Sequence, residues 1–374
     1  QAGRDCPALS LYLTLDEATL DIRSHESRIE RVPIAHNLRH DQLDAVVTEE
    51  WLEDRTCISQ IASQPSSELR EQLSFLYRLA KDLKAKREVV RGKPETFNRP
   101  DYSFRLVNND EFPAGAEPQG NETVQISTRQ RGAPLDLLVA EAMILANSTW
   151  GNWMAELGVP GIYRSQASLA PGIKVRMGTR ALPHAGIGVK SYAWSSSPLR
   201  RYVDLVNQWQ IIACVKHGKA AALAAPFKPK DASLFAIISS FEEAYSAYNG
   251  YQSGMERFWT LQYLRQNGIT ELEATAFKDN LVRADTLPLV LPIMGAQNLP
   301  RGARVRVRLG EMDLITLDIN GTVLERLDAP ADEPADADAN ADADEQDDDE
   351  VAGPIAIAVD VSEPADASSD NPAP

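Results

Sequence analysis

Cysteine and long apolar runs are the features that this sequence has least of. Its 374 residues include three widely spaced cysteines, Cys6, Cys57 and Cys214. This odd and scattered set argues against a disulfide framework and a paired-cysteine metal motif, and favours reduced thiols. No stretch approaches the roughly 18–20 apolar residues of a membrane span, and no signal peptide is visible. We therefore expect a cytoplasmic protein that does not cross a membrane.

Lysine and arginine are absent from the end of the chain. Residues 328–374 hold 16 of the 54 acidic residues, which leaves 38 acidic against 38 basic residues in the remainder. The net charge of −16 therefore belongs to this segment and does not exclude an anionic partner for the rest. Its Ala, Asp, Glu and Pro residues cannot bury enough apolar surface to offset chain entropy, so we expect disorder. We interpret it as a solubilising tail, with the binding of basic partners as the alternative.

Apolar spacing predicts an α+β protein. Helical spacing occurs in five segments, at residues 41–53, 66–91, 134–157, 198–218 and 232–266. Strand-like alternation occurs at residues 8–34, 102–107, 123–128, 289–293, 303–309, 314–317 and 322–327. Aromatic residues recur along 232–266, among them Tyr248 and Tyr251. That spacing favours a stripe that faces the core over a surface that stacks on nucleobases.

Two adjacent arginines mark the expected start of the helix at 198–218. Ser197 and Pro198 fit an N-cap and a first helical residue, which would place Arg200 and Arg201 in the first turn. Cations there oppose the helix dipole at a cost of about 0.3–1 kcal/mol each, whereas the free amides of a first turn attract anions. The pair therefore indicates a bound phosphate, which Arg can hold bidentately. An ion pair with an acid of another segment is the equal alternative.

Charged residues elsewhere offer two further candidates. Glu141 flanks the apolar stripe of the helix at 134–157, where a carboxylate needs a partner; a surface ion pair is the ordinary interpretation. Arg304, Arg306 and Arg308 alternate along one expected strand and so share a face suited to backbone phosphates. A solvated strand face explains these arginines equally well.

The run from His184 to Leu205 resembles the signature of the ribonuclease II/R (RNB) family of 3′→5′ exoribonucleases. That signature has a His, a Gly-x-Gly, a Tyr and then Thr-Ser-Pro-Ile-Arg-Arg-Tyr-x-Asp-Leu. The matching residues here are His184, Gly186, Gly188, Tyr192, Ser197, Pro198, Arg200, Arg201, Tyr202, Asp204 and Leu205. In addition, residues 139–147 resemble the family's Val-Glu-Glu-Ala-Met-x-x-Ala-Asn helix, and residues 161–164 resemble its next segment.

The resemblance implies stepwise hydrolysis of single-stranded RNA from its 3′ end to nucleoside 5′-monophosphates. It places Arg200 at the scissile phosphate as a catalytic residue, with Arg201 at a neighbouring phosphate or an internal carboxylate. Glu141 falls on the family carboxylate that contacts RNA near the cleavage site, where it can accept the ribose 2′-hydroxyl proton.

Further RNA contacts follow from the same resemblance. His184, Tyr192 and Ser197 would line the RNA channel, although a satisfied core His and a packed Tyr are equally good interpretations of the first two. His40 falls where the family often has a Tyr that stacks on the terminal base. Arg304, Arg306 and Arg308 would lie on the small OB-type RNA-binding barrel that closes RNB-family chains.

The resemblance also defines the expected domains. Residues 1–268 correspond to the C-terminal portion of an RNB domain, with a mixed sheet and long helices. Residues 269–327 correspond to the OB-type barrel, and residues 328–374 form the acidic tail.

The family's metal site has no counterpart in residues 1–327. RNB enzymes use divalent metal ions, with Mg²⁺ expected, on an Asp-x₅-Asp-x-Asp-Asp-Ala run, and 1–327 contains no such run. Because the chain begins at Gln1, a truncated or processed product is one expectation. We expect weak RNA binding and negligible hydrolysis by this chain alone. The alternatives are a non-catalytic RNA-binding or regulatory module, one half of a split ribonuclease completed by a second chain, and a structural protein with a degenerate RNB fold.

Overall fold

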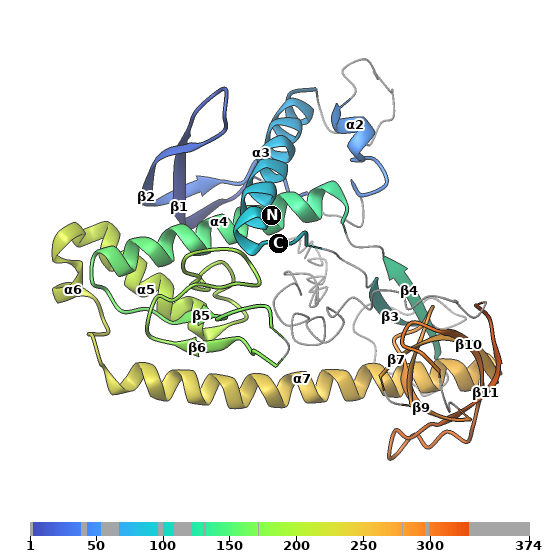
Figure 1. Cartoon of the computed structure of the whole chain (residues 1–374). Helices are drawn as coiled ribbons and strands as arrows, with labels where there is room; N and C mark the ends of the chain where they lie inside the picture. Colours follow the sequence, from blue (N-terminus) through green and yellow to red (C-terminus); the bar gives the residue numbers. More distant parts are fainter. Residues whose placement is uncertain are drawn as a thin grey trace, which may run out of the picture. The chain divides into compact units, whose positions relative to one another are not determined.

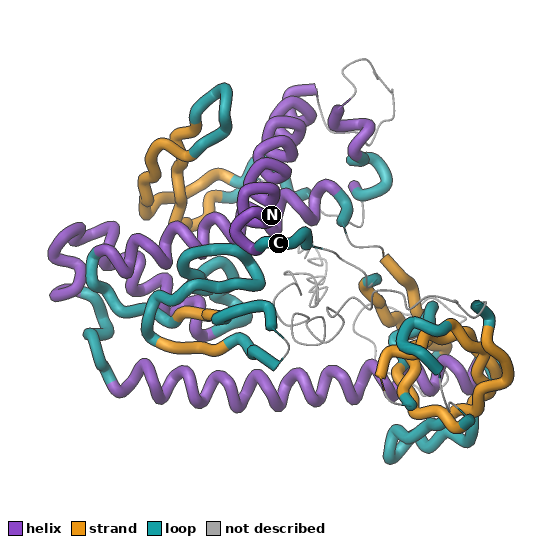
Figure 2. Tube along the Cα trace, viewed as in Figure 1, coloured by secondary structure: helices purple, strands orange, loops and turns teal. Residues whose placement is uncertain are grey.

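A computed structural model describes residues 3–38, 43–53, 67–95, 100–107, 122–129, 132–170, 172–278, 280–295 and 299–328 (Figure 1). Their fold is of the predicted α+β class, with long helices, short two-stranded ribbons and one barrel (Figure 2). The described residues divide into two compact units, one from 1–101 and 128–253 and the other from 102–127 and 254–328.

The first unit opens with a long antiparallel hairpin. Strands β1 (Asp5–Leu15) and β2 (Ile22–Pro33) pair from Asp5 opposite Pro33 to Leu15 opposite Ile22. The sequence predicted strands within residues 8–34, and the two observed strands begin earlier, at Asp5, and meet at a turn in which Leu20 has a positive φ of 57°. The apolar side of β1 packs into a core cluster through Leu9 and Leu11.

The named helices of the described residues after the hairpin are α2 (Glu49–Glu53), α3 (Ser67–Arg91) and α4 (Pro134–Glu156). Helices α3 and α4 pack together. The buried face of α4 differs from the predicted apolar stripe, because it carries the polar residues Glu141 and Asn147, while Ala142 is exposed. Buried polar side chains on a helix need partners, and those partners build the site described below.

The rest of the first unit surrounds helix α5. Its elements are β5 (Tyr163–Ser165), β6 (Arg176–Gly178), α5 (Tyr202–His217), η1 (Gly218–Ala220), α6 (Ala221–Ala224) and the first part of α7 (Ala232–Gln266). Helix α7 has the predicted bounds, and Gly268 closes its end with a φ of +61°, as expected for a C-terminal glycine. The loop between β6 and α5 holds the signature residues from His184 to Arg201, and the last three signature residues, Tyr202, Asp204 and Leu205, lie in α5.

The second unit contains a closed barrel of five strands. These are β7 (Glu271–Lys278), β8 (Leu281–Ala284), β9 (Val290–Met294), β10 (Arg304–Leu309) and β11 (Gly321–Arg326), in the order β10-β11-β9-β8-β7. The β9–β11 pair is parallel and the other described pairs are antiparallel. Leu261 and Leu264 of α7 join the barrel core. Five strands in one small barrel agree with the expected OB-type domain.

A ribbon of β3 (Asp101–Val107) and β4 (Thr123–Arg129) has the predicted position, and most of it belongs to the second unit. The side-chain amide of Gln266 at the end of α7 bonds to the backbone of Val124 and Glu122, and so fixes the start of β4.

The compact units divide inside α7, between Ser253 and Gly254, whereas the boundary predicted from the sequence follows the end of that helix at residue 268. The expected strand at 314–317 is instead a turn, because the Asp313 carboxylate accepts the amides of Ile315 and Thr316. None of the described helices is long and apolar enough to cross a bilayer. The predicted acidic tail lies outside the described residues from 329 onward.

Candidate functional site

The loop before α5 does not form the helix start that the sequence predicted. Helix α5 begins at Tyr202, and residues 198–200 form a turn in which the amides of Arg200 and Arg201 donate to the carbonyl of Ser197 at 3.2 and 3.1 Å. Ser197 is not the N-cap, since its own amide donates to the Asp204 carboxylate at 2.8 Å. Both arginines therefore precede the helix, and the carboxylate of Asp204 occupies its first turn, where the dipole favours an anion.

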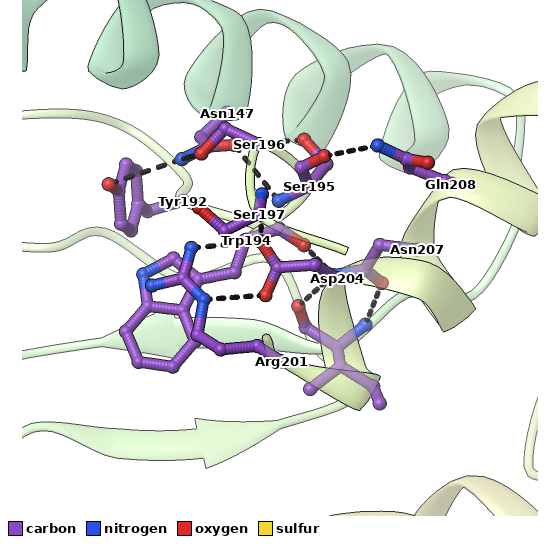
Figure 3. A network of polar contacts seen from close by, with 11 residues as sticks. Asn147, Tyr192, Trp194, Ser195, Ser196, Ser197, Arg201, Asp204, Asn207 and Gln208 are labelled. Atoms are coloured by element: carbon purple, nitrogen blue, oxygen red, sulfur yellow. Dashed lines mark hydrogen bonds and ion pairs between the residues drawn. The ribbon is translucent and has the colours of Figure 1, made fainter. Parts of the chain in front are cut away.

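Arg201 is buried and fully engaged inside the protein. Its Nε and Nη2 atoms each donate to Asp204 at 2.8 Å, and its guanidinium lies 3.8 Å from the centre of the Trp194 ring (Figure 3). Asp204 is completely buried, and Arg201 is 7% exposed. The internal carboxylate, rather than a phosphate, is thus the partner of Arg201 in this structure.

Arg200 has the opposite environment. Its side chain is exposed, its neighbour Leu199 is fully exposed, and it forms no ion pair with any described residue. Although it reaches solvent, partial burial among protein atoms lowers the pKa of Arg200, and the adjacent Arg201 charge lowers it further. An arginine remains protonated at physiological pH. The loop therefore presents one guanidinium outward and neutralises the other.

Buried amide side chains hold this loop in place. The Oδ1 atom of Asn147 accepts from the Ser195 amide at 3.0 Å and from its hydroxyl at 2.8 Å (Figure 3). Asn207 bonds to the carbonyl of Trp194 at 2.7 Å and to both backbone groups of Ile162. Gln208 donates to the Ser195 carbonyl at 2.7 Å. Such satisfied buried networks fix a single conformation, so α4 and α5 together hold the backbone of the loop at residues 194–195.

Glu141 is locked in an interior ion pair. It is 2% exposed, and both its oxygens accept from the Arg87 guanidinium, with Nε to Oε2 at 2.9 Å. Arg87 also donates to Glu95 at 3.1 Å and to the Ile187 carbonyl at 2.5 Å. Burial is the largest influence on Arg87 and opposes its charge, but the interactions with Glu141 and Glu95 together outweigh burial and raise the pKa of Arg87. The predicted surface pair is therefore wrong, and contact of Glu141 with ribose requires this pair to open.

The structure buries two residues that were expected to line an RNA channel. His184 is completely buried, and its Nδ1 accepts the Ile187 amide at 3.2 Å. Tyr192 is 6% exposed and meets His184 edge to face at 6.0 Å. Both match the core interpretation that the sequence left open. Ser197 is partly buried and acts through its amide on Asp204, and His40 lies outside the described residues.

The three barrel arginines share one strand, as predicted, but each has acidic partners. Arg304 pairs with Glu273 at 2.9 Å and Asp285 at 3.1 Å. Arg306 pairs with Glu325 at 2.5 Å, and Arg308 lies 3.4 Å from Glu271. These exposed pairs are weak, yet they leave this face without a net positive charge from the three arginines.

Sequence reasoning missed the buried polar residues that support Arg200. Asn147, Asp204 and Asn207 received no role, and Arg87 was not considered as a partner of Glu141. The signal for Asp204 was its i, i+3 spacing from Arg201, which brings two side chains together on one helical turn. The Arg87–Glu141 pair joins residues that are 54 positions apart, and no local pattern reveals it.

The described residues do not offer a metal centre. No group of three or more His, Cys, Asp or Glu side chains among them is placed to hold an ion. Divalent-metal sites that cut phosphodiesters need several oxygen ligands in a fixed arrangement. The residues present therefore do not fit such a site.

Comparison with known proteins identifies the family. The RNB domain matches residues 1–173 and 172–217. The chain belongs to the RNB family. It is 25% identical to an uncharacterized ribonuclease of Synechocystis sp. over 289 residues, covering 71% of this chain and 37% of that protein. It is also 25% identical to the mitochondrial exoribonuclease II of Saccharomyces cerevisiae over 263 residues, covering 60% and 25%.

Solved structures support the same fold. The chain resembles an active-site mutant of the Dss1 exoribonuclease from Candida glabrata, with a TM-score of 0.66 and 18% identity, over 86% of this chain and 45% of that one. It resembles Mycoplasma genitalium RNase R bound to ribose-methylated single-stranded RNA, with a TM-score of 0.62 and 13% identity, over 87% and 58%. The chain spans only part of its curated relatives: 37% of the length of the Synechocystis ribonuclease and 25% of the length of the yeast exoribonuclease.

Proposed function

We propose that this chain is the RNA-holding part of a 3′→5′ exoribonuclease and that Arg200 contacts the scissile phosphate. Family membership supports the reaction class. The observation that carries the role of Arg200 is the contrast with its neighbour, because Arg201 is neutralised by Asp204 while Arg200 is exposed and unpaired among the described residues. The Arg200 backbone is held in a turn and its guanidinium is exposed. This arrangement suits a phosphate that arrives and leaves with each nucleotide.

The chemistry of Arg200 follows from its side chain. A guanidinium donates two parallel bonds to the non-bridging oxygens of a phosphodiester. Those bonds fix the phosphate in place and stabilise the negative charge that grows as the P–O bond is cleaved. The buried network around Asn147 and Asp204 holds the backbone of the loop that carries this donor.

Hydrolysis needs a component that the described residues do not supply. RNB exoribonucleases are generally metal-dependent, and the described part of the chain holds no suitable cluster. We infer that the metal ligands come from another segment or from a second chain, with Mg²⁺ as the expected ion because it prefers oxygen ligands. The protein as given should bind single-stranded RNA and release no mononucleotides.

The first test measures RNA affinity by fluorescence anisotropy with a labelled single-stranded RNA. Arg200→Ala should weaken binding about ten- to 150-fold, since a hydrogen bond to a charged group contributes about 1.5–3 kcal/mol. Arg78→Ala removes the same charge from an exposed position on α3 and is the control, with a change below about twofold. If both variants lose the same affinity for RNA, Arg200 contributes only its general positive charge and the proposed phosphate contact is wrong.

A second test addresses hydrolysis. Incubation with Mg²⁺ and 5′-labelled RNA should leave the RNA intact, and release of mononucleotides would contradict the proposal. Adding a chain that carries the family's aspartate run should then produce shortening from the 3′ end that depends on Arg200. If the protein binds RNA but the RNA is not shortened even with such a chain present, the second candidate function is favoured, a non-catalytic RNA-binding module. The lack of a metal-binding cluster among the described residues supports this candidate.

A further inference from the structure

An aromatic stripe of α7 runs past the loop that carries Arg200. Leu234 and Ile238 are buried in the core beneath this loop. One turn further on, Phe241 and Tyr245 stack on each other at 5.3 Å, and each meets Trp194 at 6.4 Å. Because Trp194 also carries the Arg201 guanidinium, this part of α7 is fixed next to the arginine loop.

The stripe continues beyond the residues that cover it. Tyr248 lies three residues after Tyr245 and therefore on the same side of the helix, but 42% of Tyr248 is exposed. Tyr245 and the Arg201 guanidinium meet the same Trp194 ring, and Arg200 is the residue before Arg201 in the loop. An uncovered aromatic ring and an exposed guanidinium without an ion pair in the described structure thus share one small surface.

We propose that Tyr248 is a base-stacking residue, on whose ring lies a nucleobase of the RNA whose phosphate Arg200 binds. This inference rests on the proposed function. A nucleotide offers the two groups that this surface lacks, an anion for the guanidinium and a flat π-face for the ring. Single-stranded nucleic acids are held in this way, by cations along the backbone and aromatic rings under the bases.

The charges of α7 are compatible with such a ligand. Exposed Glu242 and Glu243 are the nearest acids before Tyr248 on the helix. At about 100° of rotation per residue, they lie on other faces than the stripe of Phe241, Tyr245 and Tyr248. An RNA strand that follows the stripe therefore does not cross these carboxylates.

The test uses the full 374-residue chain and a labelled single-stranded RNA. Tyr248→Ala should weaken binding about five- to 150-fold, because stacking of one base contributes about 1–3 kcal/mol. Tyr248→Phe keeps the ring and should stay within about twofold of the unaltered chain. Tyr12→Ala is the matched control, since Tyr12 is 44% exposed but already has Arg28 at 4.5 Å over its ring; it should also stay within twofold.

A set of RNAs with one abasic position each separates stacking from an effect on the fold. At the position that stacks on Tyr248, the unaltered chain should lose affinity, and Tyr248→Ala should cause no further loss. A Tyr248→Ala defect of equal size on every abasic RNA would overturn the inference, as would binding within twofold of the unaltered chain on intact RNA.

The outcomes distinguish this inference from the proposed function. If Arg200→Ala weakens binding and Tyr248→Ala does not, the proposed function stands and the stacking role falls. If the unaltered chain binds no single-stranded RNA, both fall together. If one abasic position lowers the affinity of the unaltered chain and Tyr248→Ala causes no further loss on that RNA, the stacking subsite is assigned to Tyr248.

Discussion

Replacing Asp204 by Asn tests the support of the arginine loop most directly. The Asp204 carboxylate accepts three bonds of 2.8 Å, two from Arg201 and one from the Ser197 amide, and it is fully buried. Asn has the same size and keeps one oxygen acceptor, but it removes the negative charge. Arg201 then remains buried with the Trp194 ring as its main described partner.

The expected loss of stability follows from these contacts. Removing one partner of a buried ion pair costs about 3–5 kcal/mol. The Trp194 ring and the remaining Asn oxygen retain part of the interaction, so we expect a loss of about 3 kcal/mol, near the lower limit. RNA affinity should fall as well, because the Ser197 amide loses a charged acceptor and the turn that presents Arg200 becomes less fixed.

Urea unfolding followed by tryptophan fluorescence measures the stability term. With a urea dependence of about 1–3 kcal/mol per M, Asp204→Asn should lower the midpoint by about 1 M or more. Arg201→Met supplies the second arm of a double-mutant cycle, because Asp204→Asn in that background no longer leaves an unpaired guanidinium. A cost for Asp204→Asn that is unchanged by Arg201→Met would refute the reasoning.

Two further predictions concern the first unit. Gly188→Ala should destabilise the chain by more than about 1 kcal/mol in thermal unfolding, because Gly188 has a φ of +76° and an added Cβ would lie 2.4 Å from the Arg87 carbonyl oxygen; Gly178→Ala, which has open space around it, should change little. Burial raises the pKa of the Cys214 thiol to about 11. Its neutral form is thus favoured in the folded state, and its contribution to stability is fully present below the ordinary value of 9.0 and is lost as the pH rises towards 11. Native Cys214 should therefore resist alkylation at pH 9, as peptide mass spectrometry can check, and rapid alkylation would contradict its burial.

The sequence predicted helices well wherever one apolar stripe decides the structure. Helix α7 has the expected bounds, 232–266, because its stripe is long and ends at a glycine. The start of α5 was wrong by four residues, since Ser197-Pro198 has the local chemistry of a helix start. The Ser197 amide bonds to the side chain of Asp204 instead, and this tertiary contact overrides the local preference. Similarly, the turn at 314–317 depends on the Asp313 side chain rather than on alternation.

The sequence named candidate site residues, and the structure shows surroundings that the sequence could not predict. The exposed Arg200 agrees with a phosphate contact, whereas Glu141 is engaged by Arg87. Apolar periodicity cannot reveal such a partner. In the sequence, a charged residue that is buried against another helix has the same spacing as a charged residue at the solvent-exposed edge of the apolar stripe. The α7 stripe shows the same limit, since spacing cannot tell that Tyr245 is partly buried and Tyr248 is exposed.

The opposite environments of the two adjacent arginines explain how one loop can both fold and bind. Two like charges side by side repel, and burying either one alone would be costly. Asp204 cancels the charge of Arg201, and the Trp194 ring covers the Arg201 guanidinium. Arg201 therefore anchors the loop in the interior, while the positive charge of Arg200 stays outside. On the barrel, Arg304 and its neighbours face acids instead, and an arriving phosphate would have to displace those partners. Phosphate recognition should therefore depend more on Arg200 than on the barrel arginines, even though the barrel carries more of them on one strand.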